Sequence, residues 1–352
     1  MKKRTALKSK ESYEDTWNDA LKIMQSDIIN KDKHLIDILD NLLKNKVHKR
    51  FEKKFFRDFH KKLGIPMKRN QLPRERLVVQ NGEYRIVPLN TILDYNFIDI
   101  LAEFVQEKEN QLDYVIELGS GIGINLFLLA YKLEPALRKR LRFFSCEFTD
   151  SGRKACQELL KLRDEFPMSI EYFDYYKPDF SFLSPKKNVL FITAHSIEQI
   201  PQIDRAVFTE MLEVSNQCYC YHAEPVGWQY DEAVASQRLH LKPSHWKENR
   251  SKFRHRLEKI DRWTFSRFGI GVVNIGGKFG IDIEKSDIGR SDKVSTNAAM
   301  YSFAKDYNAN LVAVLKEMQS EGLIKIDTEM INLYGKNPFN PTSLISWHKI
   351  GV

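Results

Sequence analysis

The sequence has few cysteines, and their spacing argues against a metal or redox site. Only four cysteines occur in 352 residues, and three of them fall in apolar strand or helix patterns. Cys218 and Cys220 lie two residues apart on one face of an expected strand, which suits neither a zinc knuckle nor a Cys-x-x-Cys redox pair. We therefore expect buried, reduced thiols.

The sequence also lacks a long apolar run. None reaches the roughly 18 residues that a membrane-spanning helix needs. The first residues, Met1 to Arg4, are basic and are followed by further charge rather than by the apolar core of a signal peptide. We therefore expect a cytoplasmic protein without a membrane span. With 42% hydrophobic residues, the chain can form one large α/β domain or two smaller ones.

The net charge of +8 comes from the N-terminal part of the chain. Residues 1–75 hold 20 Lys or Arg against 11 Asp or Glu, whereas the remainder holds 35 against 36. Such a segment could bind nucleic acid or an anionic membrane surface, because basic side chains neutralise phosphates. Its phenylalanines, however, recur at about helical spacing, which favours a core-facing helix stripe. Both alternatives stay open.

A strand, a glycine turn and a helix follow one another directly from residue 113 onward. Residues 113–118 form a short β-branched run typical of a strand buried on both faces of a parallel sheet. Gly119, Gly121 and Gly123 then give a turn in which the backbone can approach a ligand closely. The helix expected from residue 125 would place free backbone N–H groups beside this turn. This order of elements predicts a nucleotide-cofactor site.

From residue 113 onward, strands and helices alternate. Further strands are expected at residues 141–146, 169–173, 188–193 and 217–221, and each ends on polar residues. The alternation predicts a doubly wound, mostly parallel α/β sheet with a ligand crevice at the carboxyl ends of its strands. The polar residues at these ends are Glu147, Asp174, His195, His222 and Glu224.

The remaining segments suggest two domains. Residues 1–87 are expected to form an N-terminal helical cap with a short hairpin around Asn81 and Gly82, which could also support a homodimer. Residues 88–352 form the α/β domain. Within it, residues 225–298 interrupt the alternation as an aromatic, charged insertion, which we expect to be a substrate-binding lid. A helix at residues 299–321 precedes two strands with a short connection, which makes those strands antiparallel neighbours.

Over residues 88–352 the sequence resembles the class I S-adenosylmethionine-dependent methyltransferases. That family has a seven-stranded sheet with an antiparallel last strand, and its first motif matches Glu117 and the glycines that follow. The resemblance implies that Glu117 positions the amino-acid end of the cofactor, that Glu147 accepts hydrogen bonds from the ribose, and that Asp174 reads the adenine. The residues implied to bind S-adenosylmethionine are Glu117, Gly119, Ser120, Gly121, Gly123, Glu147, Asp174 and Tyr175.

A nicotinamide-dependent dehydrogenase is the main alternative at the level of the fold, because it shares the glycine turn and the ribose carboxylate. Its fingerprint, however, spaces the third glycine three residues after the second. Here Gly123 follows Gly121 by two residues, and Ile124 occupies the dinucleotide position. The glycine spacing therefore favours the methyltransferase.

Candidate catalytic residues lie at the ends of the fourth and fifth expected strands. His195 is suited to be a general base, because the reference pKa of histidine is about 6.5. It could equally be a helix-start histidine bonded to backbone. His222 and Glu224, together with Glu198, could bind substrate hydroxyls or a divalent metal, although a metal is not favoured because this set is not a specific signature.

The acceptor is less well defined by the sequence. The Asn-Pro-Pro-Tyr motif of amino-methylating members is absent after the fourth strand, where the chain has Thr193-Ala194-His195-Ser196. A cysteine nucleophile is also missing there. We therefore expect O-methylation of a small molecule or glycan. The alternative is an RNA- or protein-directed methyltransferase that uses the basic residues 1–75.

Overall fold

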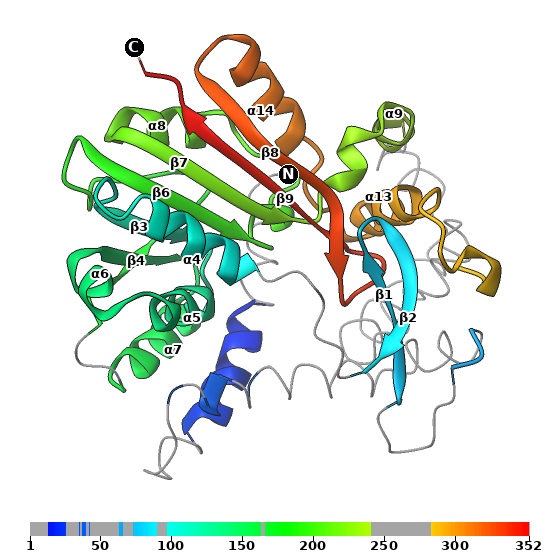
Figure 1. The fold of residues 1–352 in the computed structure, drawn as a ribbon, viewed down its shortest axis with the longest axis horizontal. Helices are drawn as coiled ribbons and strands as arrows, with labels where there is room; N and C mark the ends of the chain where they lie inside the picture. The colour runs from blue at the N-terminus through cyan, green and yellow to red at the C-terminus, as the bar shows by residue number, and fades with distance from the viewer. Residues whose placement is uncertain are drawn as a thin grey trace, which may run out of the picture.

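A mixed sheet forms the centre of the molecule (Figure 1). The computed structural model describes residues 13–25, 35, 37–39, 42, 63–65, 73–89, 97–162, 166–240 and 283–351. Its strands are β1 (Glu75–Gln80), β2 (Glu83–Pro88), β3 (Tyr114–Leu118), β4 (Arg142–Glu147), β5 (Met168–Tyr172), β6 (Lys187–Ala194), β7 (Ser215–Glu224), β8 (Ile324–Gly335) and β9 (Thr342–Lys349). They lie in the order β2-β1-β8-β9-β7-β6-β3-β4-β5.

The alternating part of the sequence forms the parallel part of the sheet. Strands β3 to β7 pair in parallel with one another, whereas β9 is antiparallel to both β7 and β8. The carboxyl ends of β3 to β7 therefore meet at one edge of the sheet, as the alternation predicts. The short connection between β8 and β9 reaches the same edge, because β8 runs parallel to β7.

The sheet has nine described strands, two more than the seven expected. The additional pair is the hairpin β1–β2, whose turn residues Asn81 and Gly82 have φ values of 49° and 77°. Such positive φ values are those of a type I′ turn. Strand β1 also pairs with the end of β8, through Val79 opposite Gly335. The edge of β8 presents backbone groups that β1 can pair with. The hairpin therefore extends the sheet at β8 and does not stand apart in a cap.

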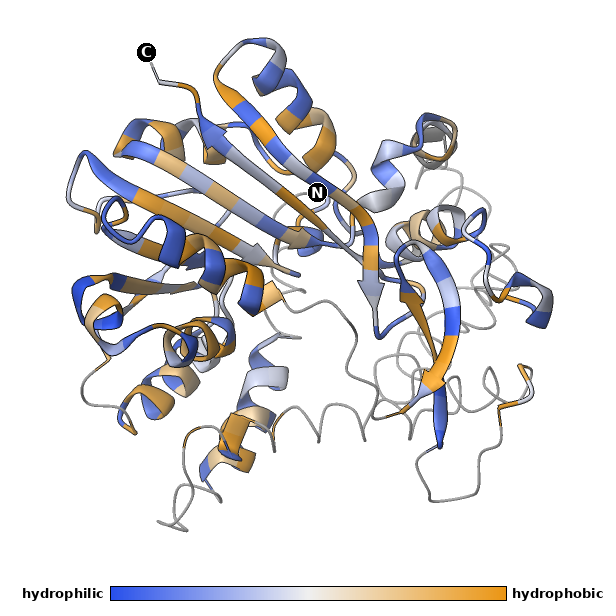
Figure 2. Cartoon of the chain, viewed as in Figure 1, coloured by the Kyte–Doolittle hydropathy of each residue, from blue (hydrophilic) through white to orange (hydrophobic). Residues whose placement is uncertain are grey.

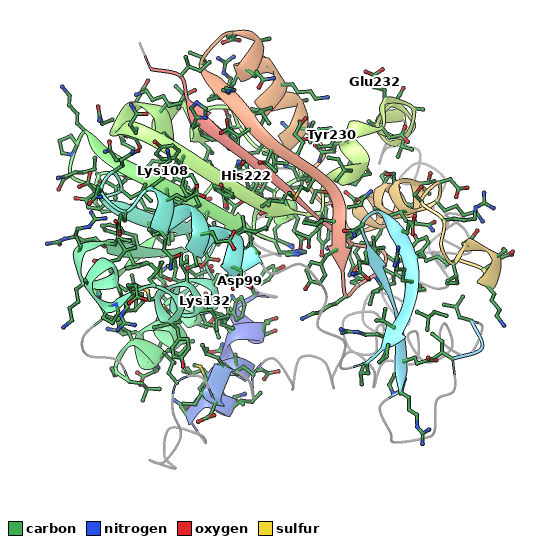
Figure 3. The ribbon with its side chains drawn as sticks, in the orientation of Figure 1. Asp99, Lys108, Lys132, His222, Tyr230 and Glu232 are labelled. Carbon is green, nitrogen blue, oxygen red and sulfur yellow. The ribbon has the colours of Figure 1, made fainter. Side chains whose placement is uncertain are left out.

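Helices cover both faces of the sheet. On one face lie α4 (Phe97–Glu107), α5 (Ile124–Lys132), α6 (Pro135–Arg140) and α7 (Asp150–Leu160), and on the other α8 (Ala206–Val214) and α14 (Leu311–Ser320). Alternate residues of β3 serve the two faces, with Val115 packing towards α4–α7 and Ile116 towards α8 and α14. Between α4 and α5, Asp99 and Lys132 form an ion pair (Figure 3). Hydrophobic and hydrophilic residues are mixed along both the strands and the helices (Figure 2).

The single helix expected at residues 299–321 is two helices. Helix α13 (Val294–Lys305) ends at Asp306, which has a left-handed φ of 58°, and α14 begins at Leu311. Between them, Asn308 Oδ1 accepts hydrogen bonds from the backbone N–H groups of Asn310 and Leu311 at 3.0 and 2.8 Å. These bonds satisfy free N–H groups at the start of α14. The apolar pattern of the sequence therefore runs through two separate helices.

Two expected segments are described only in part. Most of residues 1–75 lie outside the described residues, and so do residues 241–282 of the expected lid. The boundary between residues 87 and 88, the lid role of residues 225–298, the homodimer and nucleic-acid binding stay predictions. A helix does form at residues 13–25, and its Leu21 and Met24 join the apolar cluster of α4–α7. Within the described part of the chain, no helix is both long and apolar enough to cross a bilayer.

Candidate functional site

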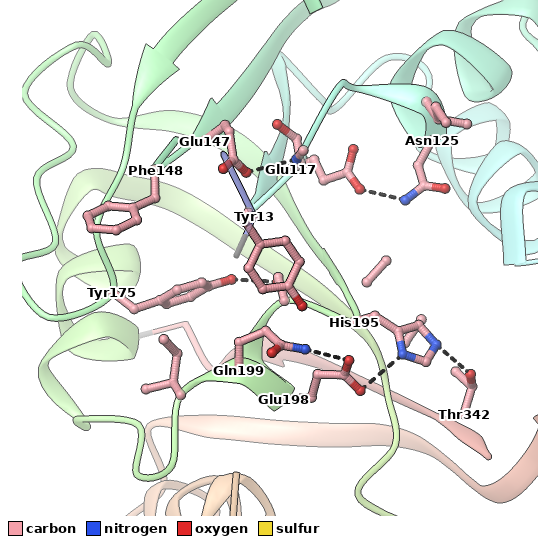
Figure 4. A pocket seen from close by; sticks show the side chains of 18 of the residues that line it. Tyr13, Glu117, Asn125, Glu147, Phe148, Tyr175, His195, Glu198, Gln199 and Thr342 are labelled. Atoms are coloured by element: carbon pink, nitrogen blue, oxygen red, sulfur yellow. Dashed lines mark hydrogen bonds and ion pairs between the residues drawn. The ribbon is translucent and has the colours of Figure 1, made fainter. Parts of the chain in front are cut away.

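A cavity of about 640 Å³ lies at the carboxyl ends of the parallel strands. This volume falls within the usual range for small-molecule sites. Residues from the ends of β3, β4, β6 and β7 line it, as do residues of the β8–β9 connection and of the helix at residues 13–25. Figure 4 shows the carboxylates of Glu117 and Glu147 on one side and His195 with Glu198 on the other. We call the side of Glu117 and Glu147, where the sequence predicts the cofactor, the cofactor half. We call the side of His195 and Glu198, where the sequence predicts the acceptor, the acceptor half.

The glycine turn is fastened to the end of β4. Gly119, Gly121 and Gly123 all have left-handed φ values, of 70°, 58° and 76°. The N–H groups of Gly119 and Ser120 donate to the carbonyl of Cys146 at 2.8 and 3.0 Å. A Cβ on Gly119 would lie 2.5 Å from the Cβ of Ser196. Only glycine therefore fits between the ends of β3 and β6.

Glu117 is buried at the base of this turn and is only half satisfied. Its side-chain Oε1 accepts a hydrogen bond from Asn125 Nδ2 at 2.6 Å, whereas Oε2 is buried with no hydrogen-bond partner among the described residues. Burial raises the pKa of Glu117 to about 8, against the opposing effect of the Asn125 hydrogen bond. An unpaired buried carboxylate oxygen is costly, so the site suits a ligand that brings a cationic donor.

Glu147 ties the glycine turn to the start of α7. Its Oε2 accepts from Gly121 N at 2.9 Å, and its Oε1 accepts from the backbone and side chain of Thr149 at 2.8 and 2.6 Å. A carboxylate has about four acceptor positions, so Glu147 keeps capacity for a ligand hydroxyl. The aromatic ring of Phe148, the next residue, also lines the cavity.

Asp174 and Tyr175 follow β5 and line the same half of the cavity. Asp174 Oδ1 accepts a hydrogen bond from the N–H of Tyr176 at 2.9 Å. Tyr175 is mostly buried, and its phenol donates to the carbonyl of Leu118 at 3.0 Å. The phenol also contacts Ser196 Oγ at 2.8 Å. The structure thus brings all the expected cofactor residues together, although Gly123 lies behind the lining.

His195 lies at the end of β6 in a strained conformation. Its φ of 55° is unusual for a bulky residue, and its N–H donates to the carbonyl of Ala223 at 3.1 Å. Its ring lies 3.1 Å from Glu198 Oε2 through Nδ1 and 2.9 Å from Thr342 Oγ1 through Nε2 (Figure 4). Because a carboxylate only accepts, Nδ1 carries the proton, and the Thr342 hydroxyl donates to Nε2.

Glu198 is held in place on both of its oxygens. Oε1 accepts from Gln199 Nε2 at 2.6 Å, and Oε2 accepts from Asn340 Nδ2 at 2.9 Å in addition to His195. The Glu198 side chain is 8% exposed, whereas that of His195 is 44% exposed. The carboxylate is therefore a fixed support, and the imidazole is the part of the pair that a ligand can reach.

Glu224 does not fit the catalytic role expected from the sequence. It is fully buried and is absent from the cavity lining. Its Oε1 accepts from the N–H groups of Ser196 and Ile197, and its Oε2 accepts from that of Glu198, each at 3.1 Å. Burial raises the pKa of Glu224 to about 7. Glu224 therefore supports the loop behind His195 and is not placed to contact an acceptor.

His222 is also placed away from the cavity, inside the sheet (Figure 3). Its Nε2 accepts a hydrogen bond from Trp347 Nε1 at 2.9 Å, and its Nδ1 lies 2.9 Å from Thr193 Oγ1. Burial lowers the pKa of His222 to about 3. With both nitrogens engaged and no exposed surface, this imidazole cannot reach an acceptor, which corrects the expected catalytic role.

Most of the acceptor half, and the aromatic residues that the helix at residues 13–25 brings to the cavity, could not be predicted from the sequence. Tyr13 and Trp17 come from the helix at residues 13–25, Tyr301 from α13, and Tyr307 from the connection to α14. Nothing local in the sequence marks these aromatics as site residues. The β8–β9 connection could have been predicted to line the site, because a strand parallel to β7 must end at the edge of the sheet where the crevice lies. The lining residues of this connection and of the strand ends beside it are Tyr334, Gly335, Lys336, Asn337, Asn340 and Thr342.

The described residues contain no group of three or more His, Cys, Asp or Glu side chains that could hold a metal ion. His195 and Glu198 form a pair, and the buried His222 and Glu224 bond to other groups. The cluster of these four residues expected from the sequence therefore divides into separate environments.

No family model and no curated protein matches the sequence. Similar solved structures include the O-methyltransferase TomG from Streptomyces achromogenes in complex with SAM, with 9% identity, 72% of this chain and 79% of that chain covered, and a TM-score of 0.36. The magnesium protoporphyrin IX methyltransferase from Synechocystis with bound SAH has 9% identity, coverages of 74% and 90%, and a TM-score of 0.38. The CurJ carbon methyltransferase has 11% identity, coverages of 72% and 54%, and a TM-score of 0.38. Likeness at this level carries no argument about activity.

Proposed function

We propose that this protein is an S-adenosylmethionine-dependent methyltransferase that methylates a hydroxyl group of a small molecule or glycan. The observation that carries the proposal is the buried Oε2 of Glu117 beside the glycine turn, which has no hydrogen-bond partner among the described residues. It lies in the same cavity as the His195–Glu198 pair. The first feature suits a cationic cofactor, and the second suits removal of a proton from an acceptor.

The cofactor half fits S-adenosylmethionine along its length. The Glu117 carboxylate would receive the ammonium group of the amino-acid end, and Glu147 would accept from the ribose. Asp174, with Phe148 and Tyr175 nearby, would hold the adenine. The last strand along the chain, β9, runs antiparallel between β7 and β8, which resembles the antiparallel last strand of a class I methyltransferase. These features support the proposal together.

His195 would act as the general base. The bound cofactor supplies an electrophilic methyl group. Glu198 fixes the imidazole through Nδ1, which directs the Nε2 lone pair towards the position from which the Thr342 hydroxyl donates at 2.9 Å. An acceptor hydroxyl that displaces the Thr342 hydroxyl from Nε2 would give its proton to that nitrogen as its oxygen takes the methyl group. S-adenosylhomocysteine would then leave, and Glu198 would stabilise the imidazolium. Positioned bases of this kind contribute about 10²–10⁴-fold in rate.

The acceptor half suits a ring-shaped molecule. Tyr13, Tyr301 and Tyr307 line it, and the rings of Tyr301 and Tyr307 lie 6.1 Å apart in an edge arrangement. Aromatic side chains offer flat apolar faces with a polar tip, which suit the stacking of a sugar or a phenol. Gln199 and Asn340 add polar groups at the same place.

The test is transfer of labelled methyl groups from S-adenosylmethionine to a panel of sugars, phenols, RNA and protein. We expect the label on a hydroxyl oxygen of a small acceptor. The proposed acceptor class is wrong if label appears on RNA or protein and on none of the small molecules. In that case the basic residues 1–75 become the first place to look for the binding surface. The proposal as a whole fails if the protein neither binds S-adenosylmethionine nor transfers its methyl group.

A further inference from the structure

We propose that the helix formed by residues 13–25 is a lid over the cofactor half of the cavity and that Glu14 is its latch. The inference rests on the proposed function, because that function identifies what the lid covers. It is carried by contacts of this helix with α7 and with the glycine turn, more than a hundred residues away in the sequence.

The latch is the carboxylate of Glu14. Its Oε1 accepts from Asp150 N and its Oε2 from Ser151 N, both at 2.9 Å. In return, Ser151 Oγ donates to the backbone carbonyl of Glu14 at 3.1 Å. These N–H groups belong to the first turn of α7, where helix geometry leaves them without intrahelical partners. A carboxylate there is favoured both by charge-assisted hydrogen bonding and by the helix dipole.

The cover consists of two aromatic residues, one turn apart. The indole of Trp17 lies directly on Gly121, since a Cβ on Gly121 would be 2.5 Å from Trp17 Cζ2 and 2.8 Å from Cη2. Tyr13 extends into the cavity, between the Glu147 side and the Glu198 side (Figure 4). Burial, together with the charge of Glu198, raises the pKa of the Tyr13 phenol. A cofactor bound along the glycine turn would lie beneath this helix.

The two ends of the helix are held differently. Leu21 and Met24, in its second half, are buried in the apolar cluster of α4–α7. The first half is fixed to α7 through Glu14. Trp17 also packs against the edge of this cluster. Losing the Glu14 bonds would therefore loosen the start of the helix, with Tyr13 and Trp17, while Leu21 and Met24 keep its second half anchored. Opening of this first half would let S-adenosylmethionine enter and S-adenosylhomocysteine leave, a step that often limits turnover.

The experiment compares Glu14→Gln with Asp15→Asn. Asp15 is exposed and adjacent on the same helix, so its variant removes the same charge and leaves the hydrogen bonds of Glu14 to Asp150 and Ser151 in place. In Glu14→Gln the amide nitrogen faces one of the two N–H donors, so one latch bond is lost. We expect S-adenosylhomocysteine to dissociate about tenfold faster from Glu14→Gln in a stopped-flow displacement assay, the loss typical of one hydrogen bond to a charged group. Asp15→Asn should behave as the wild type, and both variants should unfold cooperatively.

Hydrogen exchange gives a second measurement. S-adenosylhomocysteine should slow exchange in residues 13–25 of the wild type and Asp15→Asn, and should slow it less in Glu14→Gln. The lid is refuted if the wild type binds S-adenosylhomocysteine but the dissociation rates of the two variants agree. It is also refuted if the ligand leaves exchange in this helix unchanged. Failure of the wild type to bind either cofactor form would overturn the proposed function and the lid together.

Discussion

The two halves of the cavity are assembled from different kinds of sequence. Residues 117–175 supply most of the cofactor half, at the ends of three neighbouring strands, β3, β4 and β5. The acceptor half combines the loop after β6, helix α13 and the β8–β9 connection. The helix at residues 13–25 reaches it through Tyr13, while Trp17 lies on Gly121 of the cofactor half. The cofactor half is thus a local motif on a parallel sheet, whereas the acceptor half exists only after the whole chain has folded.

The carboxylates of the two halves also differ in how they are hydrogen-bonded. In the cofactor half, Glu117 keeps one buried oxygen to which no described residue donates a hydrogen bond. In the acceptor half, both oxygens of Glu198 are bonded, and Glu224 behind it accepts three backbone N–H groups. The first arrangement leaves charge for a ligand, and the second uses charge to fix the protein. Substitutions should therefore separate binding of the cofactor from the methyl-transfer step.

The largest effect is expected from His195→Gln. Glutamine keeps polar atoms near Glu198 but cannot accept a proton, so kcat should fall by about 10²–10⁴-fold. The Kd for S-adenosylhomocysteine, set by the other half, should stay unchanged. Single-turnover methyl transfer and calorimetric binding measure the two quantities. A variant that loses binding and turnover in equal measure would show that the halves are not separable.

Glu117→Gln should give the opposite result. Replacing the carboxylate removes the partner of the ammonium group and should raise the Kd for S-adenosylmethionine by about 10- to 100-fold, the usual cost of a hydrogen bond to a charged group. At saturating cofactor, kcat should change little. Asn125→Asp is a useful comparison, because it replaces the hydrogen bond to Glu117 with repulsion and should weaken binding as well. Unchanged affinity in Glu117→Gln would remove the main support for the proposed cofactor.

The raised pKa of Glu117 adds a pH dependence to this comparison. Burial holds that pKa at about 8, so the carboxyl is protonated at pH 6 in the free protein. Binding of a cation should therefore tighten from pH 6 to pH 8, by at most about tenfold per pH unit, and Glu117→Gln should abolish that slope. The pH dependence of folding stability has the opposite sign to that of cofactor binding. The native state binds the extra proton, so this group favours folding most at low pH, and the benefit is lost as pH rises through about 8.

Much of the cofactor half could be predicted from the sequence, because glycine spacing and strand ends are local properties. The acceptor half could not, since it depends on which distant segments pack together. The spacing of His222 and Glu224 places them on one face of β7, but spacing does not reveal what covers that face. Trp347 of β9 and the loop after β6 cover it. Likewise, the Asn81–Gly82 turn predicts a hairpin, but not its pairing with β8.

Glu224→Gln should have a smaller effect, mainly on stability. The amide nitrogen would face the N–H of Glu198, which leaves a buried donor unsatisfied and should lower the free energy of unfolding by about 1–3 kcal/mol. The kcat should fall less than in His195→Gln, because the base remains but its loop is less well fixed. Urea unfolding and kcat measurements on the same sample test this. An equal loss of kcat in the two variants would restore a direct catalytic role for Glu224.

The smallest effect on activity is expected from His222→Gln, two residues away on the same strand. Glutamine can still accept from Trp347, so the free energy of unfolding should fall by about 1 kcal/mol, with kcat/KM of the folded protein unchanged. In the wild type, burial holds the His222 pKa at about 3, so the unfolded state binds the extra proton. The resulting stability is complete above about pH 6.5 and declines as pH falls towards 3. His222→Gln should lose this acid sensitivity, whereas a loss of turnover would place His222 functionally with the acceptor half despite its burial.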